Sequence, residues 1–106
     1  MSDLFAVVAE PSRREILSLL WEGERCAGDV AGNMSVTFGA VSQHLRVLRE
    51  AGVVQVRREG RRRFYRVRHE ALGPLASALE AMWGHNLRRL KATAENEEKQ
   101  HARKRR

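Results

Sequence analysis

The feature that most constrains this fold is a helical pattern that passes directly into a strand pattern between Thr37 and Arg68. In the first half, Val41, Leu45 and Leu48 recur at helical spacing, which places them on one side of a helix. After Leu48 the apolar residues soon recur at every second position, which is the period of a strand. The apolar side of this helix must therefore pack against a core close to the strands that follow it.

Both ends of this helix carry recognisable signals. Thr37 is a suitable N-cap, although Ala40 stands where a capping box has an acidic residue. Gly52 follows the last periodic residues, where a left-handed C′ residue is favoured, and Arg49 lies near the negative end of the helix dipole. We therefore predict a helix from Thr37 to just before Gly52.

Residues 53–68 indicate a β-hairpin. Apolar and polar residues alternate on both sides of a polar, glycine-containing turn at 59–62. Seven arginines and one acidic residue lie between Arg57 and Arg68. Because fold stability does not require so many like charges on one small hairpin, we predict an anionic partner.

Shorter helices are predicted ahead of this segment. They cover residues 2–9, 11–23 and 26–34. Ser12 and Glu15 have the spacing of a capping box at the start of the second. The third is joined by a tight turn to the Thr37 helix, whose outer side is polar. Together these two form a helix-turn-helix.

A long C-terminal helix is predicted from Pro74 to about Glu97. Its apolar stripe consists of Leu72, Leu75, Leu79, Met82, Trp83, Leu87 and Leu90. One small monomer cannot bury so long a stripe, so we predict a homodimer in which this helix pairs with its symmetry mate. The first helix, with Leu4, would lie beside it. We expect residues 1–97 to form one domain and residues 98–106 a basic, disordered tail.

Composition narrows the class of protein. The formal net charge of +7 on 106 residues favours a polyanion as partner. The single cysteine excludes an internal disulfide and a four-ligand zinc finger. No long apolar run indicates a signal peptide or a membrane span, so we expect a cytoplasmic protein without a membrane partner.

Three segments resemble the ArsR/SmtB-type winged-helix transcriptional regulators: residues 9–17, 41–52 and 59–65. The resemblance covers roughly residues 3–95. It implies a mainly α fold with a small β-hairpin wing, a winged helix-turn-helix that dimerises through its terminal helices. It also implies a homodimeric repressor that binds a palindromic operator in double-stranded DNA and leaves it when an inducer binds.

The resemblance also implies which residues contact DNA. The recognition-helix positions are Thr37, Phe38, Gly39, Ser42, Gln43 and Arg46, and the wing-tip positions are Arg61 and Arg62. The chemistry of the side chains agrees, since Gln43 can form two bonds with adenine and Arg46 two with guanine. The alternatives are a solvated helix face or contact with phosphates only. His44 flanks the apolar side, and we interpret it as a hydrogen-bonded packing residue.

The metal sites of the family are incomplete in this sequence. The Cys-x-Cys-Asp pattern is replaced by residues 26–29, in which Cys26 is the one cysteine and Gly28 has no side chain to offer. On the last helix, His85 stands alone with Trp83 two residues before it. We therefore predict no metal and no cofactor. Cys26 is either a thiol sensor or a buried structural cysteine, and we favour the structural role. The inducer is not determined by the sequence.

Two other functions compete with this interpretation. A nonspecific or architectural nucleic-acid-binding protein would share the positive charge but would not need a specific recognition face. An enzyme is not expected, because the sequence contains no nucleophile–base set, paired carboxylates, phosphate-binding glycine loop or complete metal site.

Overall fold

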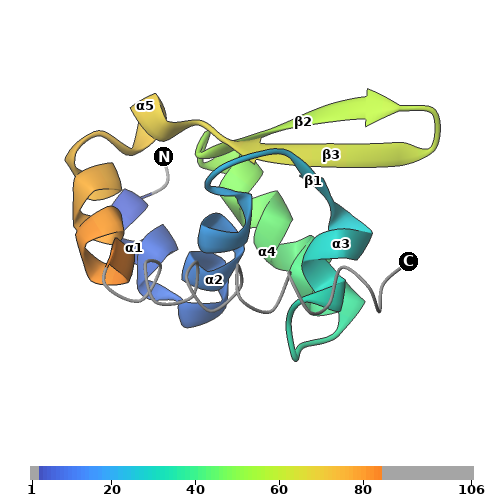
Figure 1. Cartoon of the computed structure of the whole chain (residues 1–106), viewed down its shortest axis with the longest axis horizontal. Helices are drawn as coiled ribbons and strands as arrows, with labels where there is room; N and C mark the ends of the chain where they lie inside the picture. Colours follow the sequence, from blue (N-terminus) through green and yellow to red (C-terminus); the bar gives the residue numbers. More distant parts are fainter. Residues whose placement is uncertain (1–2, 85–106) are drawn as a thin grey trace, which may run out of the picture. The chain divides into compact units, whose positions relative to one another are not determined.

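The computed structural model describes residues 3–84 and divides the chain into two units, Met1–Gly73 and Pro74–Arg106. In the first unit the elements are α1 (Leu4–Ala9), α2 (Pro11–Leu20), β1 (Arg25–Cys26), α3 (Ala27–Gly32), α4 (Phe38–Glu50), β2 (Val54–Glu59), β3 (Arg62–Val67) and α5 (His69–Leu72) (Figure 1). In the second, residues 74–84 are helical. The order of helix, turn, helix and β-hairpin is a winged helix-turn-helix, which confirms the predicted fold class.

Helix α4 begins and ends as its sequence predicts. The Thr37 side-chain Oγ1 accepts a hydrogen bond from the Ala40 backbone N at 3.0 Å, which caps the helix. At the other end Gly52 has a φ of 80°, and its N–H donates to the Arg49 carbonyl. The Val53 N–H donates to the Leu48 carbonyl, which completes a Schellman motif. These bonds place Val53 directly against the core, at the start of the hairpin.

The hairpin has its predicted alternation and a two-residue loop. Val54 pairs with Val67 and Glu59 with Arg62, which leaves Gly60 and Arg61 in the turn. Gly60 has a φ of 63°, which a side chain at this position would oppose. A third strand was not predicted: β1 pairs antiparallel with β3, so the sheet order is β1-β3-β2. A strand of two residues is too short to show the alternation of apolar and polar residues from which strands are predicted.

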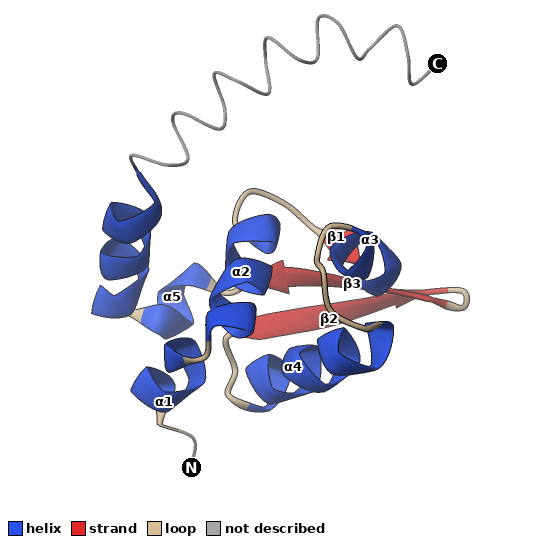
Figure 2. Cartoon of the chain, turned by 90° about the horizontal axis from the view of Figure 1, so that it is seen from below, coloured by secondary structure: helices blue, strands red, loops and turns tan. Residues whose placement is uncertain are grey.

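The core of the first unit lies between this sheet and the helices. Figures 1 and 2 show α2, α3 and α4 together on one side of the sheet. The side chains with the least exposure are Ile16, Leu17, Leu20, Val30, Val41, Leu45, Leu48, Val53, Val54 and Leu72. They come from four helices and from the start of the hairpin, so the recognition helix and the wing share one core.

Three predicted details are wrong. Helix α2 is capped by Glu10 and not by Ser12, since the Glu10 Oε1 accepts bonds from the backbone N–H groups of Ser12 and Arg13 at 2.7 and 3.2 Å. Cys26 belongs to β1 and to the N-cap of α3, because strand pairing holds its backbone extended. Leu72 ends α5 and is buried there, and Gly73, with a φ of 57°, separates it from the later helix.

The described residues contain no helix that is both long and apolar enough to cross a membrane. The predicted domain boundary at residues 97 and 98 lies outside them, as do Leu87, Leu90 and the basic tail.

Candidate nucleic-acid interface

Helix α4 presents one exposed, polar side. Gly39, Ser42, Gln43 and Arg46 lie on it, whereas Val41, Leu45 and Leu48 are buried on the opposite side. The side chain of Arg46 is 63% exposed, and its Nε lies 3.3 Å from the Glu50 carboxylate one turn later. An exposed pair of this kind is weak, so the guanidinium can exchange it for another acceptor.

His44 connects α4 to the first two helices. The Arg13 Nη1 lies 3.4 Å from the His44 Nδ1. Arginine only donates, so Nδ1 is the acceptor and the ring proton of the neutral form is on Nε2, which lies 3.9 Å from the Glu10 carboxylate. Arg13 also donates to the Val7 carbonyl of α1 at 2.8 Å. The contacts agree with the predicted packing role of His44 and fix α4 against α1 and α2.

The Glu10 carboxylate in this cluster is held in its charged form. Burial alone would raise the pKa of Glu10, but bonds from the backbone N–H groups of Arg13 and Ser12 outweigh it. The positive charge that His44 carries in its protonated form, and the charge of Arg13, act in the same direction. The net result is a pKa below the usual value for Glu10, so the cap of α2 is stable at neutral pH.

Not all arginines of the wing are available to a ligand. Arg57 donates to the Glu24 carboxylate at 2.8 and 3.1 Å and to Glu59 at 2.7 Å. Its guanidinium carbon lies 4.8 Å from the centre of the Phe64 ring. The bond from Arg57 lowers the pKa of Glu24, and the bonds to Glu24 and Glu59 raise the pKa of Arg57 further. Arg57 therefore fastens the wing to the loop after α2.

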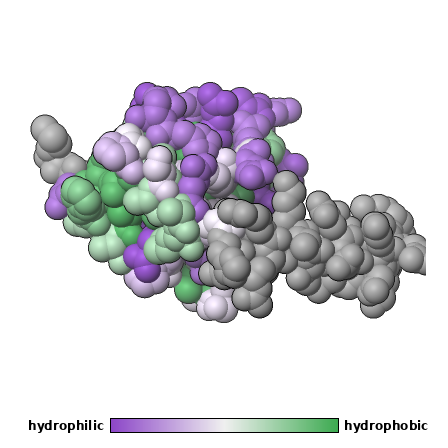
Figure 3. Space-filling model, turned by 60° about the vertical axis from the view of Figure 1, so that its left-hand side comes forward, coloured by the Kyte–Doolittle hydropathy of each residue, from purple (hydrophilic) through white to green (hydrophobic). Residues whose placement is uncertain are grey.

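The tip of the wing carries the exposed charges. Arg58, Arg61, Arg62 and Arg63 are exposed. Figure 3 shows hydrophilic residues over the upper side of the molecule, where β2, β3 and α5 lie in Figure 1. The tip is positively charged because these arginines outnumber the one acidic residue beside them, Glu59.

A cavity of about 500 Å³ lies between the wing and the recognition helix. Its walls are Cys26, Ala27, Gly28, Phe38, Ser42, Arg61, Arg62, Arg63 and Tyr65. The structure thus brings together Phe38 and Ser42 of α4 with both predicted wing-tip arginines. Gln43 and Arg46 do not line this cavity. Arg63 was not among the predicted DNA contacts, although it stands in the same run of arginines.

The structure also shows where the other predicted site residues lie. The structural role of Cys26 predicts a fully buried side chain, but the residue is only half-buried. It lines the cavity just described. Within residues 3–84, no three His, Cys, Asp or Glu side chains are placed to share a metal ion. His85 lies outside the described residues. Of the predicted dimer residues, Leu4, Leu75 and Trp83 are half-buried, Leu79 is buried and Met82 is exposed.

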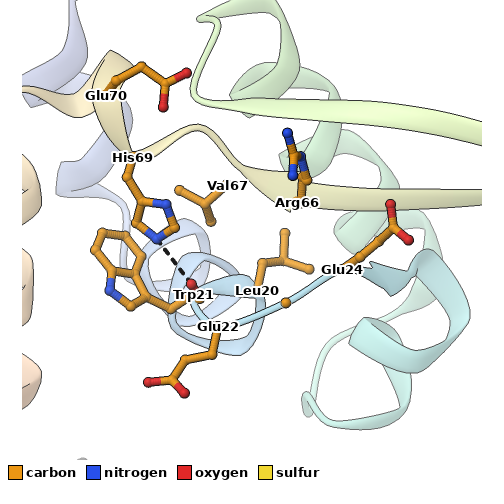
Figure 4. A pocket seen from close by; sticks show the side chains of 9 residues that line it. Leu20, Trp21, Glu22, Glu24, Arg66, Val67, His69 and Glu70 are labelled. Atoms are coloured by element: carbon orange, nitrogen blue, oxygen red, sulfur yellow. Dashed lines mark hydrogen bonds between the residues drawn. The ribbon is translucent and has the colours of Figure 1, made fainter.

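A second cavity, of about 440 Å³, lies at the other end of the sheet from the wing tip (Figure 4). There the His69 Nε2 is 3.0 Å from the Trp21 carbonyl oxygen, and the two rings meet edge to face with their centres 4.5 Å apart. The charged residues among those that line this cavity are Glu22, Glu24, Arg66, His69 and Glu70. The histidine contact fixes the start of α5 against the end of α2, a tertiary role that the sequence did not indicate.

Comparison with known proteins gives consistent matches. The sequence profile described as "Bacterial regulatory protein, arsR family" matches residues 10–56. The transcriptional repressor SdpR of Bacillus subtilis is 35% identical over 65 residues, which are 61% of this chain and 72% of that protein.

Solved structures of transcriptional regulators are also similar to this chain. The crystal structure of a possible transcriptional regulator for arsenical resistance is 40% identical, with a TM-score of 0.68 over 88% of this chain and 97% of that one. A homodimeric winged helix-turn-helix DNA-binding domain from Mycobacterium bovis, Mb0332, is 30% identical, with a TM-score of 0.65 over 77% of this chain and 76% of that one.

Proposed function

Because the chain belongs to the ArsR family of bacterial regulatory proteins, we propose that it is a homodimeric repressor that binds a palindromic operator in double-stranded DNA. It acts in the cytoplasm, and an inducer that is still to be identified releases it. The observation that carries the proposal is the exposed polar side of α4 next to an arginine-rich wing tip on the same core. The B. subtilis relative is a repressor, and the M. bovis neighbour is a homodimer.

In this proposal α4 enters the major groove and the wing reaches the flanking backbone. Gln43 and Arg46 bond base edges, Ser42 bonds a phosphate or a base, and Arg61 and Arg62 bond the backbone or the minor groove. Gly39 supports a close approach to DNA. A Cβ there would meet only the Thr37 Oγ1, at 4.0 Å, so protein packing does not require glycine. Glycine is a weak helix former, so its presence in the first turn of α4 is explained if DNA lies against that turn.

The dimer sets the geometry of the operator. We propose that two copies associate through the apolar residues Leu4, Leu75, Met82 and Trp83, and that Leu87 and Leu90, which lie outside the described residues, contribute as the sequence predicts. Leu79 was predicted to belong to this set, but its side chain is already 4% exposed within one chain and therefore has little surface to offer a partner. Two α4 helices related by a two-fold axis would enter successive major grooves, roughly one helical turn of DNA apart. A palindrome is the sequence that such a dimer can bind with both helices at once.

Fluorescence anisotropy tests the proposal by comparing the affinity of the protein for a DNA fragment from upstream of its own gene with its affinity for a scrambled fragment. With reductant and chelator present, we expect the upstream fragment to bind at least ~10³-fold more tightly, and log K to fall by about 0.9 per phosphate contact with log salt. Sedimentation should give two chains per fragment. Equal affinity for both fragments would instead favour the nonspecific nucleic-acid binder.

Arg57 and Arg61 should differ in how they affect this salt dependence. We expect Arg61→Met to reduce the slope of log K against log salt by about 0.9 for each phosphate that the variant no longer binds. Arg57→Met combined with Glu59→Gln should leave the slope unchanged, because the Arg57 guanidinium is bonded to Glu24 and Glu59. The second change keeps the net charge of the Arg57 cluster constant. Equal reductions in slope would mean that Arg57 contacts DNA.

A further inference from the structure

Phe38 exposes a large hydrophobic side chain where the proposed function places DNA. It is the first residue of α4 and is 56% exposed. Val36, in the turn just before the helix, is 37% exposed. Exposing an aromatic ring to water gains nothing for the fold, and the core beneath α4 is filled by Val41, Leu45 and Leu48 without it. A ligand that covers the ring would account for its position.

The surroundings of Phe38 limit what that ligand can be. The ring lines the cavity of about 500 Å³ together with Ser42 and the run Arg61, Arg62 and Arg63. An apolar protein surface would leave these guanidinium groups without partners, which is costly when they are buried. Double-stranded DNA has both complements, since its phosphates suit the arginines and its major groove displays one apolar group, the C5-methyl of thymine.

We propose that Phe38 contacts the C5-methyl group of a thymine in each half-site of the operator and thereby contributes to sequence specificity. The inference rests on the proposed function and adds the chemistry of one base. Gln43 and Arg46 distinguish bases by hydrogen bonds, which do not sense this methyl group. An aromatic ring in the first turn of α4 distinguishes thymine from cytosine, because cytosine carries hydrogen at the same carbon.

Replacing single thymines of the operator by deoxyuridine tests this contact, since uracil pairs with adenine and lacks only the methyl group. For the unmodified protein, we expect one position per half-site at which the change weakens binding about fourfold, as removal of one buried methyl group predicts. Changing both half-sites should weaken binding roughly fifteenfold, because the two effects multiply. In Phe38→Ala, the effect at that position should disappear, whereas effects at other thymines should remain.

Val36→Ala is the matched control, because it shortens a neighbouring exposed apolar residue and should keep the full deoxyuridine effect. Thermal melting of both variants establishes that they fold. The inference is overturned if no thymine shows a deoxyuridine effect, or if the effect persists in Phe38→Ala, while the operator is still preferred over scrambled DNA. Equal binding of operator and scrambled DNA overturns the proposed function and the inference together, so the two failures are distinguishable.

Discussion

The variant Gln43→Ala with Arg46→Lys is expected to bind the operator on the order of 100-fold more weakly, with little change for scrambled DNA. Each bidentate contact to the correct base contributes about 1–3 kcal/mol, and both side chains are exposed on the side of α4 that we propose to enter the major groove. Lysine keeps the positive charge but lacks the planar fork that bonds guanine twice. Competition binding with operator and scrambled DNA at fixed salt measures the preference directly.

Salt dependence provides the control for this variant. Because the net charge is unchanged, the slope of log K against log salt on scrambled DNA should match that of the unmodified protein. Substitution of both residues by alanine should lower that slope only if Arg46 contacts a phosphate. An operator preference that survives in the Gln43→Ala, Arg46→Lys protein would show that neither side chain distinguishes bases, and specificity would have to come from other residues or from DNA shape.

Leu45→Ala should lower the free energy of unfolding by about 2–5 kcal/mol. The Leu45 side chain is 1% exposed on the inner side of α4, and it shares its core with α2 and the hairpin. Removing it leaves a cavity that these elements fill only in part. Since small domains are stable by roughly 5–15 kcal/mol, the decrease is a large share of the total. Urea unfolding followed by circular dichroism measures it.

Ser42→Ala on the same helix is the matched control. Ser42 is exposed, and we expect its substitution to change the free energy of unfolding by no more than about 0.5 kcal/mol. The two variants should also differ in function, since Ser42→Ala acts on DNA binding and Leu45→Ala on folding. Comparable decreases of stability in both would contradict the assignment of the inner and outer sides of α4.

Much of the interface was predictable because its signals are local. The Thr37 cap and the Gly52 C′ residue act within a few positions of the chain, and so does the hydrophobic spacing of α4. The alternation of apolar and polar residues in the hairpin and the glycine in its turn also involve only neighbouring residues. A side chain's inner or outer position on a regular helix or strand follows from spacing alone. For this reason the exposed positions Ser42, Gln43 and Arg46 could be named from the sequence.

Other features depend on residues that are distant in the chain. Strand β1 exists because Arg25 pairs with Tyr65, and its two residues carry no pattern of their own. His44 likewise meets Arg13 across 31 positions. The cap of α2 was also misassigned, because Glu10 and Ser12 could both serve and only the folded backbone selects between them. Such contacts form only when the chain has folded, so no local sequence pattern predicts them.

By itself, the sequence determined the family, the fold class and the outer side of the recognition helix, because periodicity, caps and turns are properties of neighbouring residues. Only the tertiary structure decided which arginines of the wing are available to a ligand. Arg57 is bound by Glu24, 33 positions away, and is thereby occupied within the protein. Likewise, only folding brings Phe38 beside the arginines of the wing tip. The sequence gives the charge of each residue, but the partner of that charge depends on how segments distant in the sequence pack together.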